Sequence, residues 1–138
     1  MPIGDRELAA LLREVRRIAV VGLSPNPARP SHGVSAYMQR EGYVIIPVRP
    51  GVTTVLGEQA YPDLRAAAAS GPIDVVNVFR RSETVPELVN DCILLHPRLV
   101  WLQVGVRHEG AAQRLEAAGI PVVMDRCLMV EHAHLVGS

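Results

Sequence analysis

The chain of 138 residues contains no lysine, because all 14 of its cationic residues are arginine. A protein without lysine cannot carry a Walker-type phosphate loop, a Schiff-base lysine or a lysine that anchors pyridoxal phosphate. Cysteine is also scarce: Cys92 and Cys127 are the only two. Their number and spacing exclude a disulfide framework and a cysteine zinc site, and Cys92 lies in an apolar helical pattern as a small buried hydrophobe.

The chain also lacks an excess of charge of either sign, since 14 acidic residues balance the 14 arginines to a formal net charge of zero. Neutrality argues against bulk electrostatic binding to nucleic acid or to a membrane surface. Aromatic residues make up only 4% of the chain, so Trp101 and Phe79 are expected in the core and in a pocket wall. No apolar run exceeds the length of a strand and no signal core is present, which predicts a cytoplasmic protein.

Apolar segments of strand length alternate with helix-like patterns along the chain, as in a parallel sheet. We expect strands at 17–22, 43–48, 73–79, 99–104 and 120–124, helices at 5–15, 31–42, 63–69, 84–96, 109–118 and 128–134, a loop at 50–58 and an extended piece at 60–61. Right-handed crossovers turn this order into an α/β fold, a Rossmann-like doubly wound parallel sheet in three layers. Length and composition fit a single domain over residues 1–138.

Several helix starts carry typical capping residues. Asp5 and Ser31 are expected to cap the first two helices with their side-chain oxygens. Thr84 and Glu87 have capping-box spacing, with Pro86 in the first turn.

An arginine follows almost every predicted strand. The strands lead in turn to Arg29, Arg49, the pair Arg80 and Arg81, and Arg107. The carboxyl ends of parallel strands share one edge, where open α/β folds hold ligands. Arginine pairs bidentately with phosphate, so this rim indicates a multiply anionic ligand. The alternative is solvated surface, because arginine is the only long cation in this chain.

The switch point of the sheet is expected between the strands that end at Gly22 and Phe79. The loops there, 23–31 and 80–84, lead into helix N-termini, which favour anions. A dinucleotide such as NAD needs a glycine-rich turn at this place, but only Gly22 is present and three prolines follow it. The position after the second strand is Arg49 and not a ribose-binding acid.

The sequence resembles a known family in several segments that occur in the same order. They are Val21-Gly22-Leu23-Ser24, Arg29-Pro30-Ser31, Gly42-Tyr43 to Pro47-Val48, Asp74 to Arg80, and Asp125-Arg126-Cys127 with Glu131. The resemblance is to the small stand-alone CoA-binding proteins, which are similar to the CoA-binding domain of the succinyl-CoA synthetase α subunit. It spans roughly residues 5 to 135 and implies a Rossmann-like domain that holds coenzyme A along the carboxyl edge of the sheet.

Carried over position by position, the resemblance implies three groups of ligand contacts. Gly22 and Ser24 would approach the ligand from the first loop with Arg29 on a phosphate, Pro47, Val48 and Arg49 would line the adenine and ribose-phosphate end, and Val78, Phe79, Arg80 and Val85 would border the remainder. The first turn is rich in proline where the synthetase domain has glycines, so Arg29 is favoured over backbone N–H groups as phosphate ligand. The synthetase's phosphorylated histidine belongs to a second domain, so the resemblance implies binding without catalysis.

The alternative is a small acyl-CoA-processing enzyme that uses Cys127 or His108. A thiol beside Arg126 could be reactive, and a histidine near the carboxyl edge could act as a general base. The structural interpretation is favoured for both: an Asp125–Arg126 pair with a buried Cys127, and His108 as a surface residue that starts a helix. No nucleophile held by a base is readable, so we expect no catalytic residues.

The segment Glu131, His132 and His134 could ligate a metal, but its spacing is more typical of surface polarity, and we expect no metal. The expected ligand is coenzyme A or an acyl-CoA. A protein partner or a homo-oligomer stays open, as do the acyl group and the pathway.

Overall fold

A five-stranded parallel sheet forms the centre of the computed structural model, which describes residues 3–137. Its strands are β1 (Arg17–Val21), β2 (Val44–Val48), β5 (Val75–Val78), β6 (Leu99–Leu102) and β7 (Val122–Val123). They lie in the order β2-β1-β5-β6-β7 and every pairing is parallel. The predicted Rossmann-like fold is confirmed. The connections that leave β1 and β5 run in opposite directions along the sheet, so the switch point lies between these two strands.

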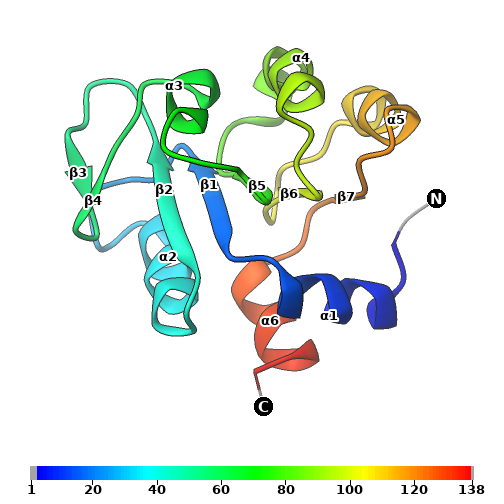
Figure 1. The fold of residues 1–138 in the computed structure, drawn as a ribbon, viewed down its shortest axis with the longest axis horizontal. Helices are drawn as coiled ribbons and strands as arrows, with labels where there is room; N and C mark the ends of the chain where they lie inside the picture. The colour runs from blue at the N-terminus through cyan, green and yellow to red at the C-terminus, as the bar shows by residue number, and fades with distance from the viewer. Residues whose placement is uncertain (1–2, 138) are drawn as a thin grey trace.

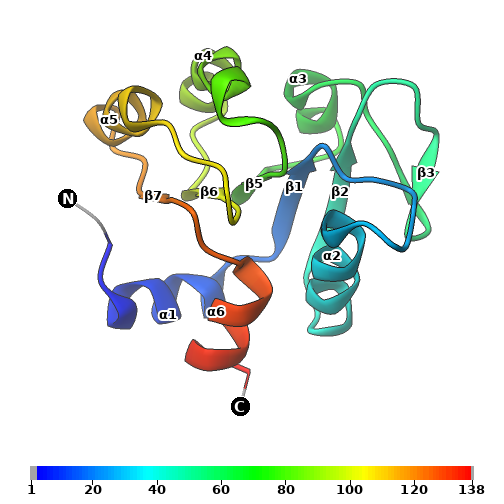
Figure 2. The same ribbon diagram turned by 180° about the vertical axis from the view of Figure 1, so that it is seen from behind.

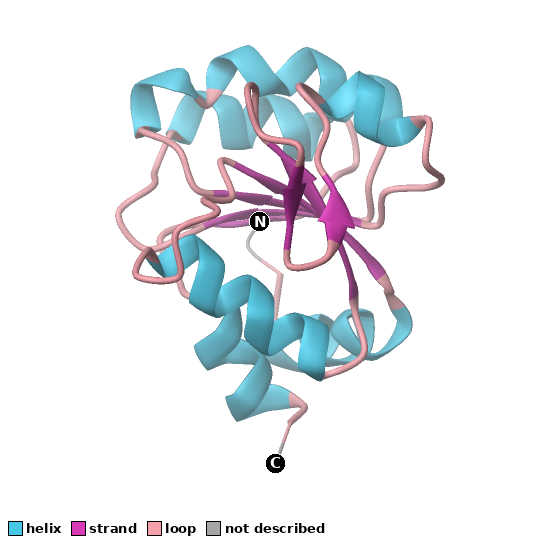
Figure 3. Cartoon of the chain, turned by 90° about the vertical axis from the view of Figure 1, so that its left-hand side faces the viewer, coloured by secondary structure: helices cyan, strands magenta, loops and turns pink. Residues whose placement is uncertain are grey.

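Helices cover both faces of the sheet (Figures 1 and 2). One face carries α1 (Asp5–Glu14), α2 (Pro30–Arg40) and α6 (Leu128–Leu135), and the other carries α3 (Leu64–Ala68), α4 (Pro86–Leu95) and α5 (Glu109–Ala117). The side view in Figure 3 shows the strands between two layers of helices. Within the described residues, no helix is long and apolar enough to cross a membrane.

Apolar residues of each strand alternate between two cores, one on each face. In β1, Ile18 and Val20 pack towards α1, α2 and α6, while Ala19 and Val21 pack towards α3, α4 and α5. This explains why the strands are apolar at nearly every position, since neither face meets water. Trp101 is fully buried, as expected.

Helix starts differ from the predicted caps in three places. The first helix is capped by Gly4, and Asp5 is its first residue. The second begins at Pro30 after Arg29, and the Ser31 hydroxyl oxygen instead accepts a bond from the backbone N–H of Ser24. Thr84 belongs to a 3-10 turn (Ser82–Thr84) and donates to the Arg81 carbonyl, so no capping box forms.

A small hairpin lies in the segment expected to be a loop. It joins β3 (Thr54–Val55) and β4 (Glu58–Gln59) through Leu56 and Gly57, whose φ angles are 55° and 78°. Two positive φ values suit a two-residue hairpin turn, but asparagine or aspartate is the usual first residue. Leucine at that position concealed the turn from the sequence pattern.

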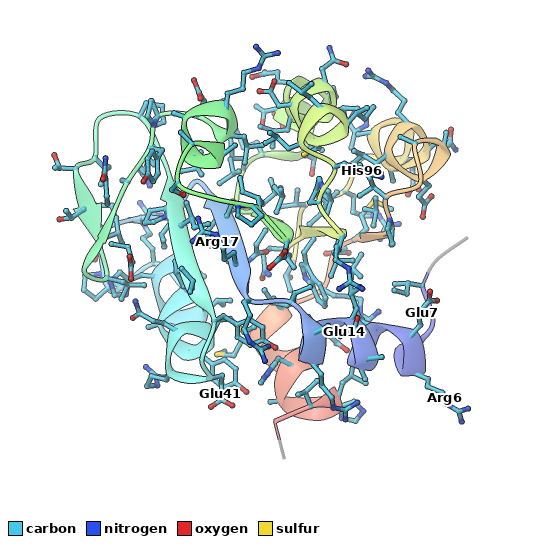
Figure 4. All side chains as sticks on the ribbon, in the orientation of Figure 1. Arg6, Glu7, Glu14, Arg17, Glu41 and His96 are labelled. Carbon is cyan, nitrogen blue, oxygen red and sulfur yellow. The ribbon has the colours of Figure 1, made fainter. Side chains whose placement is uncertain are left out.

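His132 was expected on the surface but is buried, with 3% of its area exposed. Its ring meets the edges of Tyr37 and Tyr43, and its Nδ1 shares a hydrogen bond of 2.9 Å with the Tyr37 hydroxyl. Burial lowers the pKa of His132, and the nearby carboxylate of Glu41, labelled in Figure 4, opposes that shift in part. The ring packs edge-on against Tyr37 of α2 and against Tyr43, the residue before β2, and so joins α6 to both elements.

We therefore predict that acid destabilises the protein through His132. The unfolded chain binds a proton on this imidazole near pH 6.5, whereas the folded state binds it only at lower pH. Stability should fall as the pH drops through 6.5 and level off below the folded-state pKa. His132→Gln should flatten this slope in denaturant titrations between pH 5 and 8. The exposed His134, on the same helix, is the matched control; an equally flattened slope in His134→Gln would contradict the assignment.

Candidate functional site

A cleft of about 860 Å³ opens at the carboxyl edge of the sheet, over the ends of β1, β5 and β6. It is lined by Gly22, Ser24, Pro25, Asn26, Arg29, Pro30, Ser31, Val34, Arg49, Phe79, Arg80, Arg81, Gln103, Val104, Val106 and Cys127. A second cavity of about 380 Å³ shares Gly22, Arg49, Phe79 and Arg80 with it, so the two lie side by side; Asp63 and Asp91 also line the second cavity. The site lies at the predicted switch point.

Gly22 joins the two sides of the cleft. Its φ is +86°, and a Cβ atom built there would lie 2.4 Å from the carbonyl oxygen of Phe79. The Gly22 N–H donates to the Val48 carbonyl oxygen at 2.8 Å. Only glycine combines this backbone angle with so close an approach, so the ends of β1, β2 and β5 meet at this residue.

The loop from β1 to α2 is held by its own hydrogen bonds, and Figure 2 shows it in blue between the sheet and the helix. The hydroxyl oxygen of Ser24 accepts from the N–H of Asn26 at 3.1 Å, and the Asn26 side-chain oxygen accepts from Ala28 at 3.0 Å. The Arg29 N–H donates to the Asn26 carbonyl at 3.0 Å. Pro30 opens the helix and has no N–H, which leaves fewer backbone donors for an anion. The cationic group of this loop is the side chain of Arg29.

The cleft collects arginines that have no partner. Within residues 3–137, no hydrogen bond or ion pair involves the guanidinium groups of Arg29, Arg49 or Arg81. Arg80 reaches Glu87 only at 3.9 Å. No acidic residue lines the larger cavity, so the charges of Arg29, Arg49 and Arg81 are uncompensated there and that of Arg80 is only weakly paired. Unneutralised cations converging on one cleft favour a multiply anionic ligand over ordinary surface.

Elsewhere the described arginines bond to protein oxygens, apart from Arg6 and Arg40. They are Arg13, Arg16, Arg17, Arg65, Arg98, Arg107, Arg114 and Arg126. Arg107 was expected in the rim but lies outside the cleft. It pairs with Glu109 at 2.9 Å and with Asp125 at 3.6 Å, and these carboxylates raise its pKa. The rim is therefore narrower than the sequence pattern indicated.

The structure brings together most of the ten predicted ligand contacts. Gly22, Ser24, Arg29, Arg49, Phe79 and Arg80 line the larger cavity, and Val48 lines the smaller one. Pro47, Val78 and Val85 are buried behind these residues and line neither cavity. Pro47 and Val78 are the strand residues directly before the lining residues Val48 and Phe79, and Val85 lies between the 3-10 turn and α4.

Gln103 is a cleft residue that the sequence analysis did not identify. Only 4% of it is exposed, and its Nε2 donates to the Asn77 side-chain oxygen at 2.9 Å. Both amides interrupt strands that are otherwise apolar, and such an interruption was the available signal. A buried amide pair at the base of a cleft offers hydrogen-bonding groups to a ligand.

The segment that precedes α6 differs from the expected arrangement. Asp125 and Arg126 do not pair: Asp125 accepts from the Gly105 N–H and meets Arg107, while Arg126 pairs with Glu131. Cys127 was expected to be buried but is partly exposed and lines the cleft. The thiol is therefore accessible from the ligand side.

His108 and His132 both have structural roles. His108 caps α5, because its Nδ1 accepts from the Ala111 N–H at 3.0 Å, and it does not line the cleft. Glu131 is engaged by Arg126 and His132 is buried. In the part of the chain that the structure describes, no group of three potential metal ligands occurs.

Comparison with known proteins accounts for this geometry. The family model of the CoA binding domain matches residues 16–133. The chain belongs to this family of CoA-binding domains. The uncharacterized protein YneT of Bacillus subtilis (strain 168) is 45% identical to this CoA-binding domain over 127 residues, covering 92% of this chain and 93% of the relative.

Solved structures share the fold of this CoA-binding domain. Cell-free ID.343 from Thermus thermophilus is 41% identical with a TM-score of 0.91, over 96% of this chain and 99% of that one. A hypothetical protein from Pyrococcus horikoshii OT3 is 31% identical with a TM-score of 0.89, over 99% and 97%. A dinucleotide forming acetyl-coenzyme A synthetase of Ca. Korarchaeum cryptofilum, at 20% identity and a TM-score of 0.68 over 83% of this chain and 28% of that one, shares the fold alone.

We predict that Gly22→Ala destabilises this CoA-binding domain by about 2–4 kcal/mol, because it adds a steric overlap with Phe79 to the cost of a positive φ. Gly105→Ala is the matched control: its φ is +84°, but a Cβ atom there would have no neighbour within 4 Å. The control should lose only about 1–2 kcal/mol. Urea denaturation measures both variants, and equal losses would show that the Phe79 contact is unimportant.

Proposed function

We propose that this CoA-binding domain, over residues 1–138, binds coenzyme A or an acyl-CoA in the cleft at the carboxyl edge of the sheet. The observation that carries the proposal is the convergence of Arg29, Arg49 and Arg81 on a cleft whose larger cavity has no acidic residue in its lining. Among the described residues, none of these three guanidinium groups has a hydrogen-bond or ion-pair partner. Coenzyme A supplies a pyrophosphate and a 3′-phosphate to such groups. Its adenine and pantetheine parts suit the apolar lining.

The same lining favours binding over acyl-group chemistry. Acyl transfer or hydrolysis needs a nucleophile activated by a base. Among the residues that line the larger cavity there is no histidine, aspartate or glutamate, and the nitrogen of His108 that faces α5 is engaged as a cap. The alternative of an acyl-CoA-processing enzyme at Cys127 or His108 therefore receives no support from the arrangement.

Calorimetric titration with CoA, dephospho-CoA, NAD and ATP tests the proposal directly. CoA should bind most tightly, because it alone combines three phosphate groups with the pantetheine arm. Tighter binding of NAD would overturn the assignment. Release of free thiol from acetyl-CoA or succinyl-CoA, followed in parallel, should stay at the uncatalysed rate.

We predict that Arg49→Ala weakens CoA more than dephospho-CoA, because the 3′-phosphate should lie beyond the end of β2. The backbone N–H of Arg49 is bonded to the Tyr61 carbonyl at 2.8 Å, so the guanidinium extends from a fixed position. Loss of a charge-assisted hydrogen bond costs roughly 1.5–3 kcal/mol, on the order of ten- to a hundredfold in affinity. Arg107→Ala, outside the cleft, is the control; equal losses for both ligands would show that Arg49 does not contact that phosphate.

A further prediction concerns Arg29, whose backbone is restrained by Pro30 and by its bond to Asn26. Restraint lowers the entropy lost on binding and leaves the planar guanidinium oriented before the ligand arrives. Arg29→Lys should therefore lose much of the affinity for CoA while its thermal melt stays like the parent's. Arg40→Lys, at the other end of the same helix, is the matched control. If Arg29→Lys binds CoA as tightly as the parent, a positive charge at position 29 is sufficient for binding.

A further inference from the structure

Cys127 lies on the wall of the proposed CoA cleft, and the inference drawn from it rests on the proposed function. The residue is partly exposed, whereas Cys92 is buried in the opposite core with 1% of its area exposed. Burial, and then the charge of Asp91, raise the pKa of Cys92 to about 12, so that thiol is inert. The chain therefore has one accessible thiol, and it faces the ligand site.

The two ends of the cleft differ in chemistry. Arg49 follows β2, while Cys127 lies beside the end of β6, because the Arg126 carbonyl accepts from the indole N–H of Trp101 at 2.8 Å. The sheet order places these strands three positions apart, roughly 14 Å. Arg49 thus lies at one end, and the thiol lies at the other with the apolar side chains of Val104 and Val106. Arg80 and Arg81, which follow β5, come between these two ends.

Gln103 gives an independent indication of what occupies the thiol end. Only 4% of its area is exposed and it lines the cleft. Its Nε2 donates a hydrogen bond to the side-chain oxygen of Asn77. No protein donor in the described chain is bonded to its Oε1. The residue is buried as a whole, but its unpaired Oε1 is not among the buried atoms, so it is open to the cleft. An acceptor in that position suits a ligand N–H, and the pantetheine arm of CoA has two amide N–H groups on the way to its thiol.

We propose that Cys127 forms a mixed disulfide with coenzyme A by exchange with a CoA disulfide bound through the arginine end of the cleft. The Cys127 thiolate attacks one sulfur of the disulfide, the S–S bond between the two CoA halves breaks, and a new S–S bond joins Cys127 to one CoA. The other CoA leaves as a thiolate and takes up the proton that Cys127 lost. One disulfide is consumed and one is formed, so no further oxidant is required.

Disulfide exchange fits this cleft better than acyl transfer. Exchange needs a thiolate and access to a disulfide sulfur, and no base positioned for a second step. A thioester on Cys127 would need a general base to activate water or an acceptor, and the residues that line the larger cavity supply none. The site therefore suits a reversible store or sensor of CoA in its disulfide form.

The test compares two disulfides on the same protein. The parent, reduced and freed of reductant, is treated with CoA disulfide or with pantethine, which has the same reactive sulfur and pantetheine arms but no nucleotide. Intact mass follows adduct formation, and peptide mapping identifies the modified cysteine without any variant. Because binding holds the sulfur beside Cys127, CoA disulfide should react about tenfold faster or more.

Variants check the two ends separately. Cys127→Ser should give no adduct. Arg49→Gln should slow the reaction with CoA disulfide and leave that with pantethine unchanged, while Arg107→Gln should change neither. Equal rates for the two disulfides, or modification of Cys92 in place of Cys127, would overturn the inference.

Calorimetry of the parent with CoA, kept under a phosphine reductant, separates the two proposals. If reduced CoA binds tightly in this titration but CoA disulfide and pantethine form the adduct at equal rates, the exchange is overturned and the proposed function stands. Absence of CoA binding overturns the proposed function, and the exchange with it.

Discussion

The approach of Gly22 to the Phe79 carbonyl is the constraint on which the site depends. A Cβ atom at this position would overlap that oxygen at 2.4 Å, so the end of β1 can lie against the end of β5 only as glycine. This contact sets the floor of the cleft and the direction in which the next loop leaves the sheet. The loop then carries Arg29 over the cleft, and the turn after β5 brings Arg80 and Arg81 to the same place.

Four arginines lie near one another in the cleft, and over residues 3–137 only Arg80 among them has an acidic partner, Glu87 at 3.9 Å, so their positive charges repel. The rest of the chain neutralises most of its cations through pairs such as Arg98 with Glu14 and Arg126 with Glu131. The cleft therefore holds an electrostatic cost that a phosphate-rich ligand would remove. The self-bonded loop around Asn26 keeps this arrangement in place before binding.

The opposite end of the cleft has a different character. Gln103, Val104 and Cys127 line the cleft near the end of β6, three strand positions from Arg49 at the end of β2. A ligand with phosphates at one end and a thiol on an amide-containing arm matches this polarity. Binding and thiol exchange would thus use separate parts of one continuous surface.

The sequence by itself determined the order of the parallel elements, because apolar strands such as Ile18–Val21 and Val75–Val78 can only be buried on both faces. It also located Gly22, Arg29, Arg49 and Arg80 at the carboxyl edge, since that edge follows from strand direction. Only the tertiary structure decided which partner each polar side chain binds, because several of those partners come from segments that are distant in the sequence. Arg107 turned to Glu109 and Asp125, Ser31 bonded Ser24, and Cys127 came to the cleft through contacts between distant segments.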